Sequence, residues 1–415
     1  MGWVSPVLGE DPPYHHGSHR DLLWSPADSS ATRCGIDAII VPTARRPAYL
    51  NVAANVAMAL GCALVTLHSG KWTTADKAAR RFAADVDLVA IDVPEPERLH
   101  LPDWETSRLL AGTAFARRTD LSAKRNLALM LSHMLRWSRI LFLDDDITQV
   151  NPHDVRKASG LLDTYSAVGL QIGGFPDNSV VCHAYREAGG KQQSFVGGGA
   201  LAVELTRSKS FFPDIYNDDW FYLLDGDKRL QPTAVSGQVA QYPYDPFRSP
   251  GRARAEELGD ALAEGIYWLL DQDRSIIDAD QRHWAKFLAK RGQFIQNVLE
   301  LVQGDNALDL HEKARRIAAL KGARGRLARI TPKLCESYLL AWTADRQRWL
   351  QHIEELPNRL HLPHALASLT RQGCPSLRWR LGGTFGQCSG EPAFAPPSDQ
   401  PMEAMEGSLA ACAER

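Results

Sequence analysis

The feature that most constrains the fold is an alternation of apolar strands and helices early in the chain. Three apolar segments, 36–41, 62–68 and 86–93, are separated by two alanine-rich segments, 47–60 and 75–85, with helical character. Strands that alternate with helices in this way form parallel sheets with right-handed crossovers. The sequence therefore predicts an α/β protein.

A fourth apolar segment, 140–143, leads directly into three consecutive carboxylates, Asp144, Asp145 and Asp146. Ligands of open α/β sheets bind beyond the carboxyl ends of the strands, so a site is expected here. Adjacent carboxylates repel one another unless they share a cation or a proton, and Mg²⁺ or Mn²⁺ accepts such oxygen ligands. The alternative is a solvated turn before a helix that begins near Asn151.

The segment before this strand, 121–137, has apolar residues spaced along one face of a helix. Lys124 and Arg125 lie in its first turn, where the helix dipole disfavours cations unless an anion is close. A contact with a diphosphate and a solvated helix face both fit this placement.

The second half of the chain changes character twice. Segments 167–175, 178–185 and 194–205 have the pattern of short strands with glycine-rich joints, which predicts a mixed sheet. Four amphipathic helices then follow one another. We divide the chain into a disordered arm at 1–33, an α/β domain at 34–250, a helical region at 251–372 and a disordered tail at 373–415.

Composition excludes several classes of protein. The formal net charge of −2 gives no general reason to expect a nucleic acid or a membrane surface as partner. The N-terminal segment lacks the pattern of a secretory signal, and no run of 18 apolar residues occurs. The seven cysteines have no metal-binding spacing. We expect a cytoplasmic protein without a membrane span.

Three stretches occur in a characteristic order: VPTARRPAYL at 41–50, AKRNLALMLSHMLRWSRILFLDDDI at 123–147, and FVGGGALAVEL with FFPDIYNDDWFYLL within 195–224. Together they resemble the GT-A fold glycosyltransferases, most closely family 2. The resemblance implies a Rossmann-like, mixed but mainly parallel sheet flanked by helices. It also implies transfer of a sugar from a nucleotide-diphosphate sugar to a hydroxyl of an acceptor, which we expect to be small and soluble.

The resemblance assigns the donor side of the site. It implies that Asp144 and Asp146 are the carboxylates of a DxD motif that holds Mn²⁺ or Mg²⁺ against the donor phosphates, with Asp145 between them. The other residues matched to nucleotide-sugar binding are Pro42, Thr43, Arg45, Lys124, Arg125, Gly198 and Gly199. Glycines at such positions permit close approach of the backbone to a ligand, although a bulge or tight bend explains them equally well.

The resemblance also assigns the acceptor side. Asp219 matches the catalytic base of an inverting transfer, and Asp218 matches its acidic neighbour. Crowding of the two carboxylates is expected to raise the pKa of at least one of them. The alternative is that Asn217 or Asp218 caps a helix through WFYLL.

Two departures keep other readings open. The second strand ends in His68, Ser69 and Gly70, where many family members have an aspartate that contacts the base, so the donor base is left open. Retaining GT-A enzymes that make glucosyl- or mannosyl-glycerates add a histidine ligand, for which His183 and His283 are candidates. Stereochemistry, the acceptor and the oligomeric state are left open as well.

The acidic motif is also compatible with a different class of enzyme. ILFLDDDIT also resembles the DxDxT motif of haloacid dehalogenase-type phosphatases, in which Asp144 is a nucleophile and Asp146 a general acid around Mg²⁺. That motif normally lies on the first strand, whereas three predicted strands precede it here. A third alternative is a protein that binds a nucleotide sugar without catalysing its transfer, in which Asp219 has no catalytic role.

The helical region contains one acidic pattern. Glu256, Asp260 and Glu264 follow one another at intervals of four residues, which places them on one face of a helix. Such a stripe is either a solvated face or a lid over the acceptor site.

Overall fold

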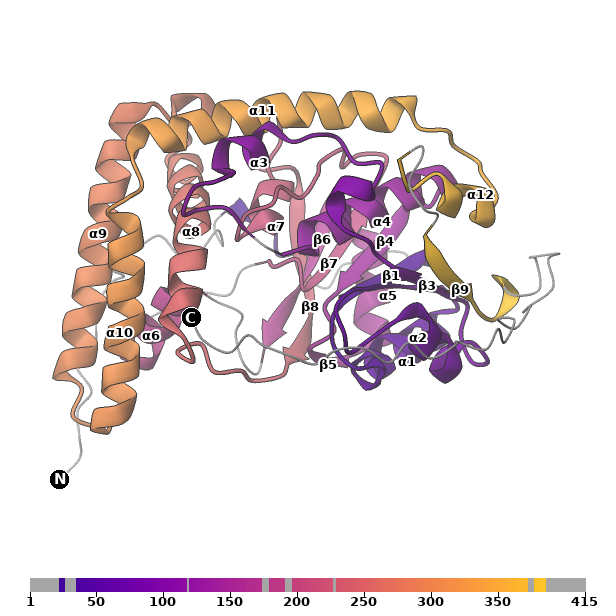
Figure 1. Cartoon of the computed structure of the whole chain (residues 1–415), viewed down its shortest axis with the longest axis horizontal. Helices are drawn as coiled ribbons and strands as arrows, with labels where there is room; N and C mark the ends of the chain where they lie inside the picture. Colours follow the sequence, from indigo (N-terminus) through magenta and orange to yellow (C-terminus); the bar gives the residue numbers. More distant parts are fainter. Residues whose placement is uncertain are drawn as a thin grey trace, which may run out of the picture.

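The computed structural model describes residues 22–26, 35–117, 119–173, 179–190, 196–226, 229–371 and 377–385. Across them runs a nine-stranded sheet with helices packed on both faces (Figure 1). Its strands are β1 (Ala38–Thr43), β2 (Ala63–His68), β3 (Leu88–Asp92), β4 (Arg139–Leu143), β5 (Ile147–Val150), β6 (Ala167–Gly173), β7 (Ala200–Glu204), β8 (Thr233–Gln241) and β9 (Arg378–Leu381).

The sheet is mixed, with the order β5-β8-β6-β7-β4-β1-β2-β3-β9. β1, β2, β3 and β4 are parallel to one another, and β6 and β8 point the same way. Only β5, β7 and β9 are antiparallel to their neighbours. The prediction of a mixed, mainly parallel sheet is therefore confirmed.

The helices fall into two groups along the chain. Those that accompany the sheet are α1 (Asn51–Leu60), α2 (Ala75–Phe82), α3 (Glu105–Leu110), α4 (Leu121–Leu135), α5 (Pro152–Leu161), α6 (Val180–Glu187) and α7 (Asp218–Tyr222). The later group is α8 (Pro250–Leu270), α9 (Gln281–Gly304), α10 (Leu310–Leu327), α11 (Pro332–Glu355) and α12 (Leu362–Ala367). The described residues also form the short 3-10 helices η2 (Pro47–Leu50), η3 (Pro96–Arg98) and η4 (Ile276–Asp278).

The sheet separates two apolar cores, because its central strands are buried on both faces. In β1, Ala38 and Ile40 belong to the core under α4, while Ile39 and Val41 belong to the core under α1, α2 and α5. This arrangement explains why the strand appears in the sequence as an uninterrupted apolar run. It also fixes the end of β1 next to the ends of β2 and β4.

Two of the predictions about elements were wrong. Residues 378–381, within the tail predicted as disordered, form β9. Segment 178–185 has the pattern of a strand, but the structure forms α6 there. The Ser179 side chain accepts a hydrogen bond from the Cys182 N–H and caps the helix at its start. Nearly all of α6 is buried, so its sequence lacks the alternation of apolar and polar residues that distinguishes a helix from a strand.

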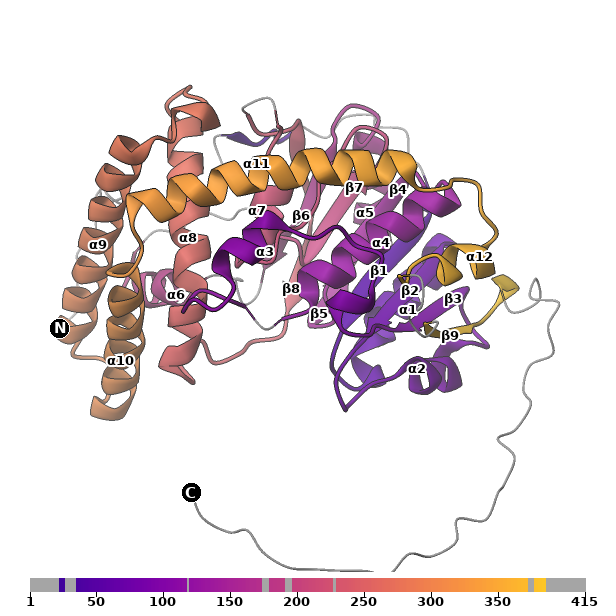
Figure 2. The ribbon, with the colours of Figure 1, turned by 45° about the horizontal axis from the view of Figure 1, so that its top comes forward.

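The later helices reach from one side of the sheet to the other. α8, α9 and α10 stand together beyond β6 and β8, and α11 crosses above α3 toward α12 (Figures 1 and 2). The chain then returns to the sheet, where β9 pairs with β3. At the other edge, the Trp24 N–H donates to the Thr233 carbonyl of β8 at 3.0 Å. No helix in the described part of the chain is long and apolar enough to cross a membrane.

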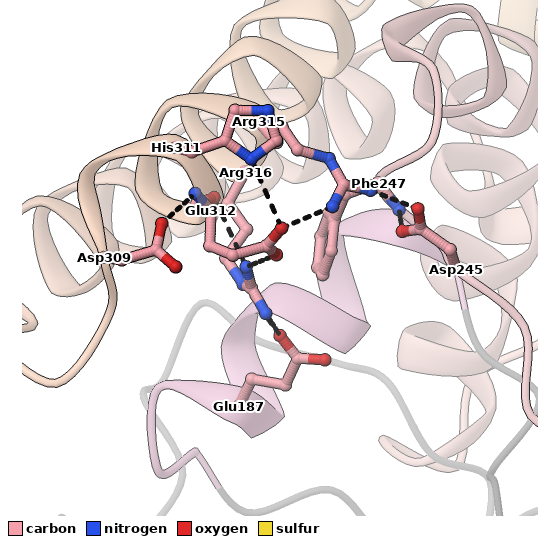
Figure 3. Close-up of polar contacts among 8 residues, drawn as sticks. All are labelled: Glu187, Asp245, Phe247, Asp309, His311, Glu312, Arg315 and Arg316. Carbon is pink, nitrogen blue, oxygen red and sulfur yellow. Dashed lines mark hydrogen bonds and ion pairs between the residues drawn. The ribbon is translucent and has the colours of Figure 1, made fainter.

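A network of ion pairs attaches α10 to α6 and to the segment that follows β8 (Figure 3). Arg316 bridges Glu187 of α6 at 2.7 Å and Glu312 of its own helix at 2.6 Å. Arg315 pairs with Glu312 and with Asp245, which follows β8. These contacts fix the start of α10 against α6 and the segment that leads into α8.

Candidate functional site

The residues singled out from the sequence come from five segments that meet at the carboxyl ends of β1 and β4. Thr43 ends β1 and residues 144–146 follow β4. The first turn of α4, the turn 197–199 before β7, and the start of α7 complete the group. Their contacts show which of these segments touch one another.

The acidic run is bound from the β1 side. Thr43 Oγ1 donates to Asp145 Oδ2 at 2.6 Å, and Arg45 lies 3.2 Å from both Asp145 Oδ1 and Asp146 Oδ2. Arg45 is partly exposed and also lies over the Tyr49 ring. Pro42 is different, because it is a buried residue inside β1. Thr43 is also buried, so of the three residues predicted here for nucleotide-sugar binding Arg45 is the one that reaches the surface.

The two cations of α4 are buried and have protein partners. Lys124 Nζ donates to the Thr43 carbonyl at 3.1 Å and to Ser69 Oγ at 2.6 Å, and it pairs with Asp120. Arg125 is only 3% exposed. Neither residue lies on a solvated helix face, so that alternative was wrong.

Arg125 joins the two acidic motifs. Its Nη1 lies 2.9 Å from Asp218 Oδ1 and its Nη2 lies 3.3 Å from Asp144 Oδ1. Its Nε is buried without a hydrogen-bond partner among the described residues. The anions that offset the unfavourable helix dipole are thus carboxylates of the protein itself.

The glycine turn lies between the same side chains. The Gly198 N–H donates to Asp219 Oδ2 at 2.6 Å, and the Gly199 carbonyl accepts from the Asp144 N–H at 2.9 Å. A Cβ on Gly198 would lie 2.7 Å from Arg125 Nη1, closer than real side chains allow. A side chain at this position would have to displace the Arg125 guanidinium from its two carboxylates, so glycine suits the close approach of turn and guanidinium.

Asp218 and Asp219 have unequal surroundings. Asp218 accepts hydrogen bonds from Arg125 and from Ser122 Oγ. Among the described residues, Asp219 accepts from two backbone N–H groups, those of Gly198 and Trp220. Burial raises the pKa of Asp219 to about 6, and the charge of Asp218 adds to the effect. The neighbouring carboxylates therefore suit different tasks.

The capping alternative for this acidic pair does not account for its geometry. Asn217 precedes α7 in the left-handed conformation, with φ 62°, and makes no side-chain capping bond. Asp218 Oδ1 accepts from the N–H of its own neighbour, Asp219, and from Arg125 Nη1. α7 is therefore held by something other than a standard cap.

The surroundings of Asp146 suit a divalent ion held together with Asp144. Asp146 Oδ1 is buried without a hydrogen-bond partner among the described residues, while Oδ2 faces Arg45 and Gln241. Burial and then the charge of Asp144 raise the pKa of Asp146. A buried acceptor beside a second carboxylate is a suitable half-site for an oxygen-bound cation.

The described residues contain no group of three or more His, Cys, Asp or Glu side chains arranged to hold a metal ion.

None of the three histidines considered from the sequence contributes to the site. His68 is buried, and its ring nitrogens each lie 2.8 Å from a hydroxyl oxygen, of Thr73 and of Thr66. Burial lowers its pKa to about 3, so it is a neutral interior residue. His183 Nε2 is bonded to Tyr244 Oη, and His283 Nε2 to the Gly265 carbonyl. Both are structural residues within the helical packing.

The acidic stripe is neither solvated nor a lid. Glu256, Asp260 and Glu264 are all buried on α8, where Glu256 pairs with Arg252 at 2.6 Å. Asp260 and Glu264 pair with Arg291 of α9. The sequence could not reveal this because the neutralising guanidinium comes from another helix.

Sequence reasoning missed a groove of about 1160 Å³ beside the site. It begins at Ser69 and Gly70 and passes the first turn of α4 to reach Asp214. Asp214 Oδ1 is buried without a partner among the described residues, and burial raises its pKa to about 6. No local pattern marks this groove, since its walls come from segments far apart in the chain.

Comparison with known proteins gives limited information. No protein-family model matches the chain, and no curated protein matches it by sequence. Among solved structures, a mannosyltransferase from Pyrobaculum calidifontis in complex with GDP-mannose and Mn²⁺ matches with 15% identity and a TM-score of 0.39. The match covers 81% of this chain and 91% of that one. Because so low a score identifies neither fold nor function, the function has to be argued from the site.

Proposed function

We propose that this protein is a metal-dependent GT-A glycosyltransferase that moves a sugar from a nucleotide-diphosphate sugar to a hydroxyl of a soluble acceptor. The observation that carries the proposal is the buried Arg125 guanidinium, which contacts Asp144 at the end of β4 and Asp218 at the start of α7. It brings a candidate metal-binding motif and a candidate base into one site at the carboxyl edge of the sheet.

The donor side is assigned to residues 144–146, the end of β1 and the first turn of α4. Asp144 and Asp146 would hold Mn²⁺ or Mg²⁺, whose charge would stabilise the departing diphosphate. Thr43 and Arg45 bind Asp145 and so orient the middle of the acidic run. Lys124 fixes the end of β1 to Ser69, which begins the adjoining groove. A nucleoside in that groove would extend from the diphosphate.

The acceptor side is assigned to Asp219. In an inverting transfer, this carboxylate takes the proton of the acceptor hydroxyl as its oxygen bonds to the anomeric carbon. The bond from that carbon to the diphosphate oxygen breaks, and the nucleoside diphosphate leaves. A pKa of about 6 leaves Asp219 ionised at neutral pH and makes it a stronger base than an ordinary aspartate.

The phosphatase alternative is less well supported. Thr148, the threonine of its DxDxT pattern, donates its hydroxyl to the Ala240 carbonyl in the pairing of β5 with β8. Asp144 Oδ1, which would belong to the nucleophile, is paired with Arg125. The two histidines considered for the retaining alternative, His183 and His283, are bonded to Tyr244 Oη and to the Gly265 carbonyl.

The deciding experiment is a thermal unfolding panel on the full chain. UDP, GDP, their sugars and simple phosphomonoesters are each added with Mn²⁺, Mg²⁺ or EDTA, because a ligand that binds only the folded state raises the unfolding midpoint. We expect a metal-dependent rise with one nucleoside diphosphate and its sugars. Stabilisation by phosphomonoesters alone, with no response to any nucleotide, would favour the phosphatase.

A further inference from the structure

α8 carries three buried carboxylates that face one buried guanidinium. Arg291 of α9 contacts Glu257 at 3.0 Å, Asp260 at 2.8 Å and Glu264 at 2.7 Å. None of the four side chains is more than 5% exposed. One cation cannot offset three buried anions, and such groups destabilise a fold unless they are fully paired.

Asp260 differs from the other two carboxylates in what its second oxygen contacts. Its Oδ2 accepts from Arg291, while its Oδ1 accepts from Asn217 Nδ2 at 3.0 Å. The other two, Glu257 and Glu264, contact Arg291 within the helical region. Among the described cluster contacts, only that of Asp260 reaches the segment that carries the proposed base.

Asn217 is the residue immediately before Asp218, and its backbone has φ 62°. A non-glycine residue in this region brings its Cβ close to its own carbonyl and persists only where its surroundings hold it. α7 spans five residues, too few to define its own direction. The direction of Asp219 therefore depends on what holds Asn217.

α8 contacts this segment at two further points. Tyr267 Oη donates to the Trp220 carbonyl at 3.0 Å. A Cβ on Gly259 would overlap the Tyr216 carbonyl oxygen, so the two backbones are in direct contact. Residues 216–220 thus lie against α8 on either side of the Asn217–Asp260 bond.

We propose that Asp260 is a positioning residue for Asp219: held by Arg291, it binds Asn217 in its left-handed conformation and so sets the direction of α7 at the acceptor site. The inference rests on the proposed function, since it gives the helical region a role in that same transfer. Asp260 touches no reacting atom and acts through Asn217.

The test compares Asp260→Asn with a matched control, Glu257→Gln. Both variants replace a buried carboxylate of α8 on the same guanidinium by an amide of equal size, but only Asp260 contacts Asn217. The readouts are the donor dissociation constant, the rate of nucleoside diphosphate release at saturating donor with Mn²⁺ and water as acceptor, and the pH dependence of that rate. The donor is the nucleotide sugar that stabilises the wild-type chain.

Asp260→Asn is expected to lower the rate about tenfold or more, since a displaced catalytic group loses its alignment. Donor affinity should stay within about twofold of the wild-type value, because the donor contacts are unchanged. The acidic limb of the pH profile should move, because it reports the surroundings of Asp219. Glu257→Gln should keep the wild-type rate and profile. Asn217→Gly, which tolerates the same φ but lacks the amide, should reproduce the Asp260→Asn result.

Equal rate losses in Asp260→Asn and Glu257→Gln, or a wild-type rate in Asp260→Asn, would overturn the inference. If Asp260→Asn does not fold, Asn217→Gly decides the matter, and a wild-type rate there rejects it. A wild-type chain that binds no nucleotide and releases no diphosphate would instead reject the proposed function, a result that is recognised before any variant is made.

Discussion

Arg125 lies between two carboxylates that the proposed reaction uses differently. It pairs with Asp144 on the donor side and Asp218 on the acceptor side. A guanidinium this deeply buried depends on both partners, because removal of either leaves a charge without compensation. Substitutions that keep Arg125 and alter only the carboxylates that it does not contact are therefore the cleanest tests of individual roles.

Asp146→Asn is the first such substitution, since Asp146 pairs with Arg45 at the surface and not with Arg125. The amide weakens the anionic half-site, so metal-dependent donor binding should fall by about tenfold or more. Calorimetry with the nucleotide sugar and Mn²⁺ measures the loss. Asp163→Asn, at an exposed carboxylate paired with Arg139, is the control and should bind as the wild type does. Undiminished Mn²⁺-dependent binding in Asp146→Asn would remove this residue from the metal assignment.

Asp219→Asn addresses the acceptor side. The amide occupies the same space and can still accept from Gly198 N–H, but it cannot take a proton. We expect donor affinity to be retained and transfer to fall by about a hundredfold or more, the usual scale for loss of a general base. Donor binding and product formation are measured on the same preparation. A variant with normal turnover would show that the base is another group.

The pH dependence of transfer follows from the same residue. Asp219 acts as a base only when ionised, and burial with the Asp218 charge raises its pKa to about 6. The rate should therefore be steady above about pH 7 and fall roughly tenfold per unit well below pH 6. A rate profile from pH 4.5 to 8.5 at saturating donor and metal measures this limb. An unchanged limb in the residual activity of Asp219→Asn would assign it to a different group.

At the scale of elements, the main chain of the turn 197–199 contacts two of the proposed site residues. The Gly198 N–H donates to the Asp219 carboxylate, and the Gly199 carbonyl accepts from the Asp144 N–H. Gly198→Ala would force its Cβ against Arg125. We expect a loss of donor binding and turnover of about tenfold or more, together with a lower unfolding midpoint. Gly304→Ala is the matched control, because a Cβ there meets nothing within 4 Å and alanine favours the helix. Equal behaviour of the two variants would mean that the turn has room to adjust.

The elements also show which parts of the fold could be predicted from the sequence. β2 and β3 end within one residue of the predicted segments, because both strands are apolar runs bounded by polar residues. α6 was missed because burial on nearly all sides removes its periodicity. The candidate site residues could be named from motifs, but their pairing through Arg125 depends on how α4 packs against α7. That packing leaves no local pattern.

At the scale of the whole molecule, the later helices are joined to the sheet by polar contacts as well as by apolar packing. Asp345 of α11 is fully buried and accepts from the Glu105 and Thr106 N–H groups at the start of α3. Asp260 of α8 makes the comparable contact with Asn217 before α7. Both contacts place a carboxylate of the helical region at the start of a short helix that accompanies the sheet. Short helices of this kind owe their stability to such tertiary contacts more than to their own sequence.

The last prediction concerns the Arg291 cluster and the stability of the whole chain. Burial raises the pKa of Glu264 to about 8 and that of Glu257 to about 7, against about 4.3 in an unfolded chain. The folded state therefore binds protons more tightly, and the stabilisation this brings is complete below about pH 4 and lost as the pH rises to about 8. Urea unfolding should show the free energy of unfolding decreasing from pH 5.5 to 8.5.

Glu264→Gln removes one of these titrating groups while keeping an oxygen for Arg291. Across the same pH range the variant should lose roughly 3 kcal/mol less stability than the wild type, an order-of-magnitude figure from the shift in pKa. Glu300→Gln, at an exposed carboxylate of α9, should follow the wild-type curve. A wild-type stability that does not change between pH 5.5 and 8.5 would mean that the cluster is fully ionised throughout.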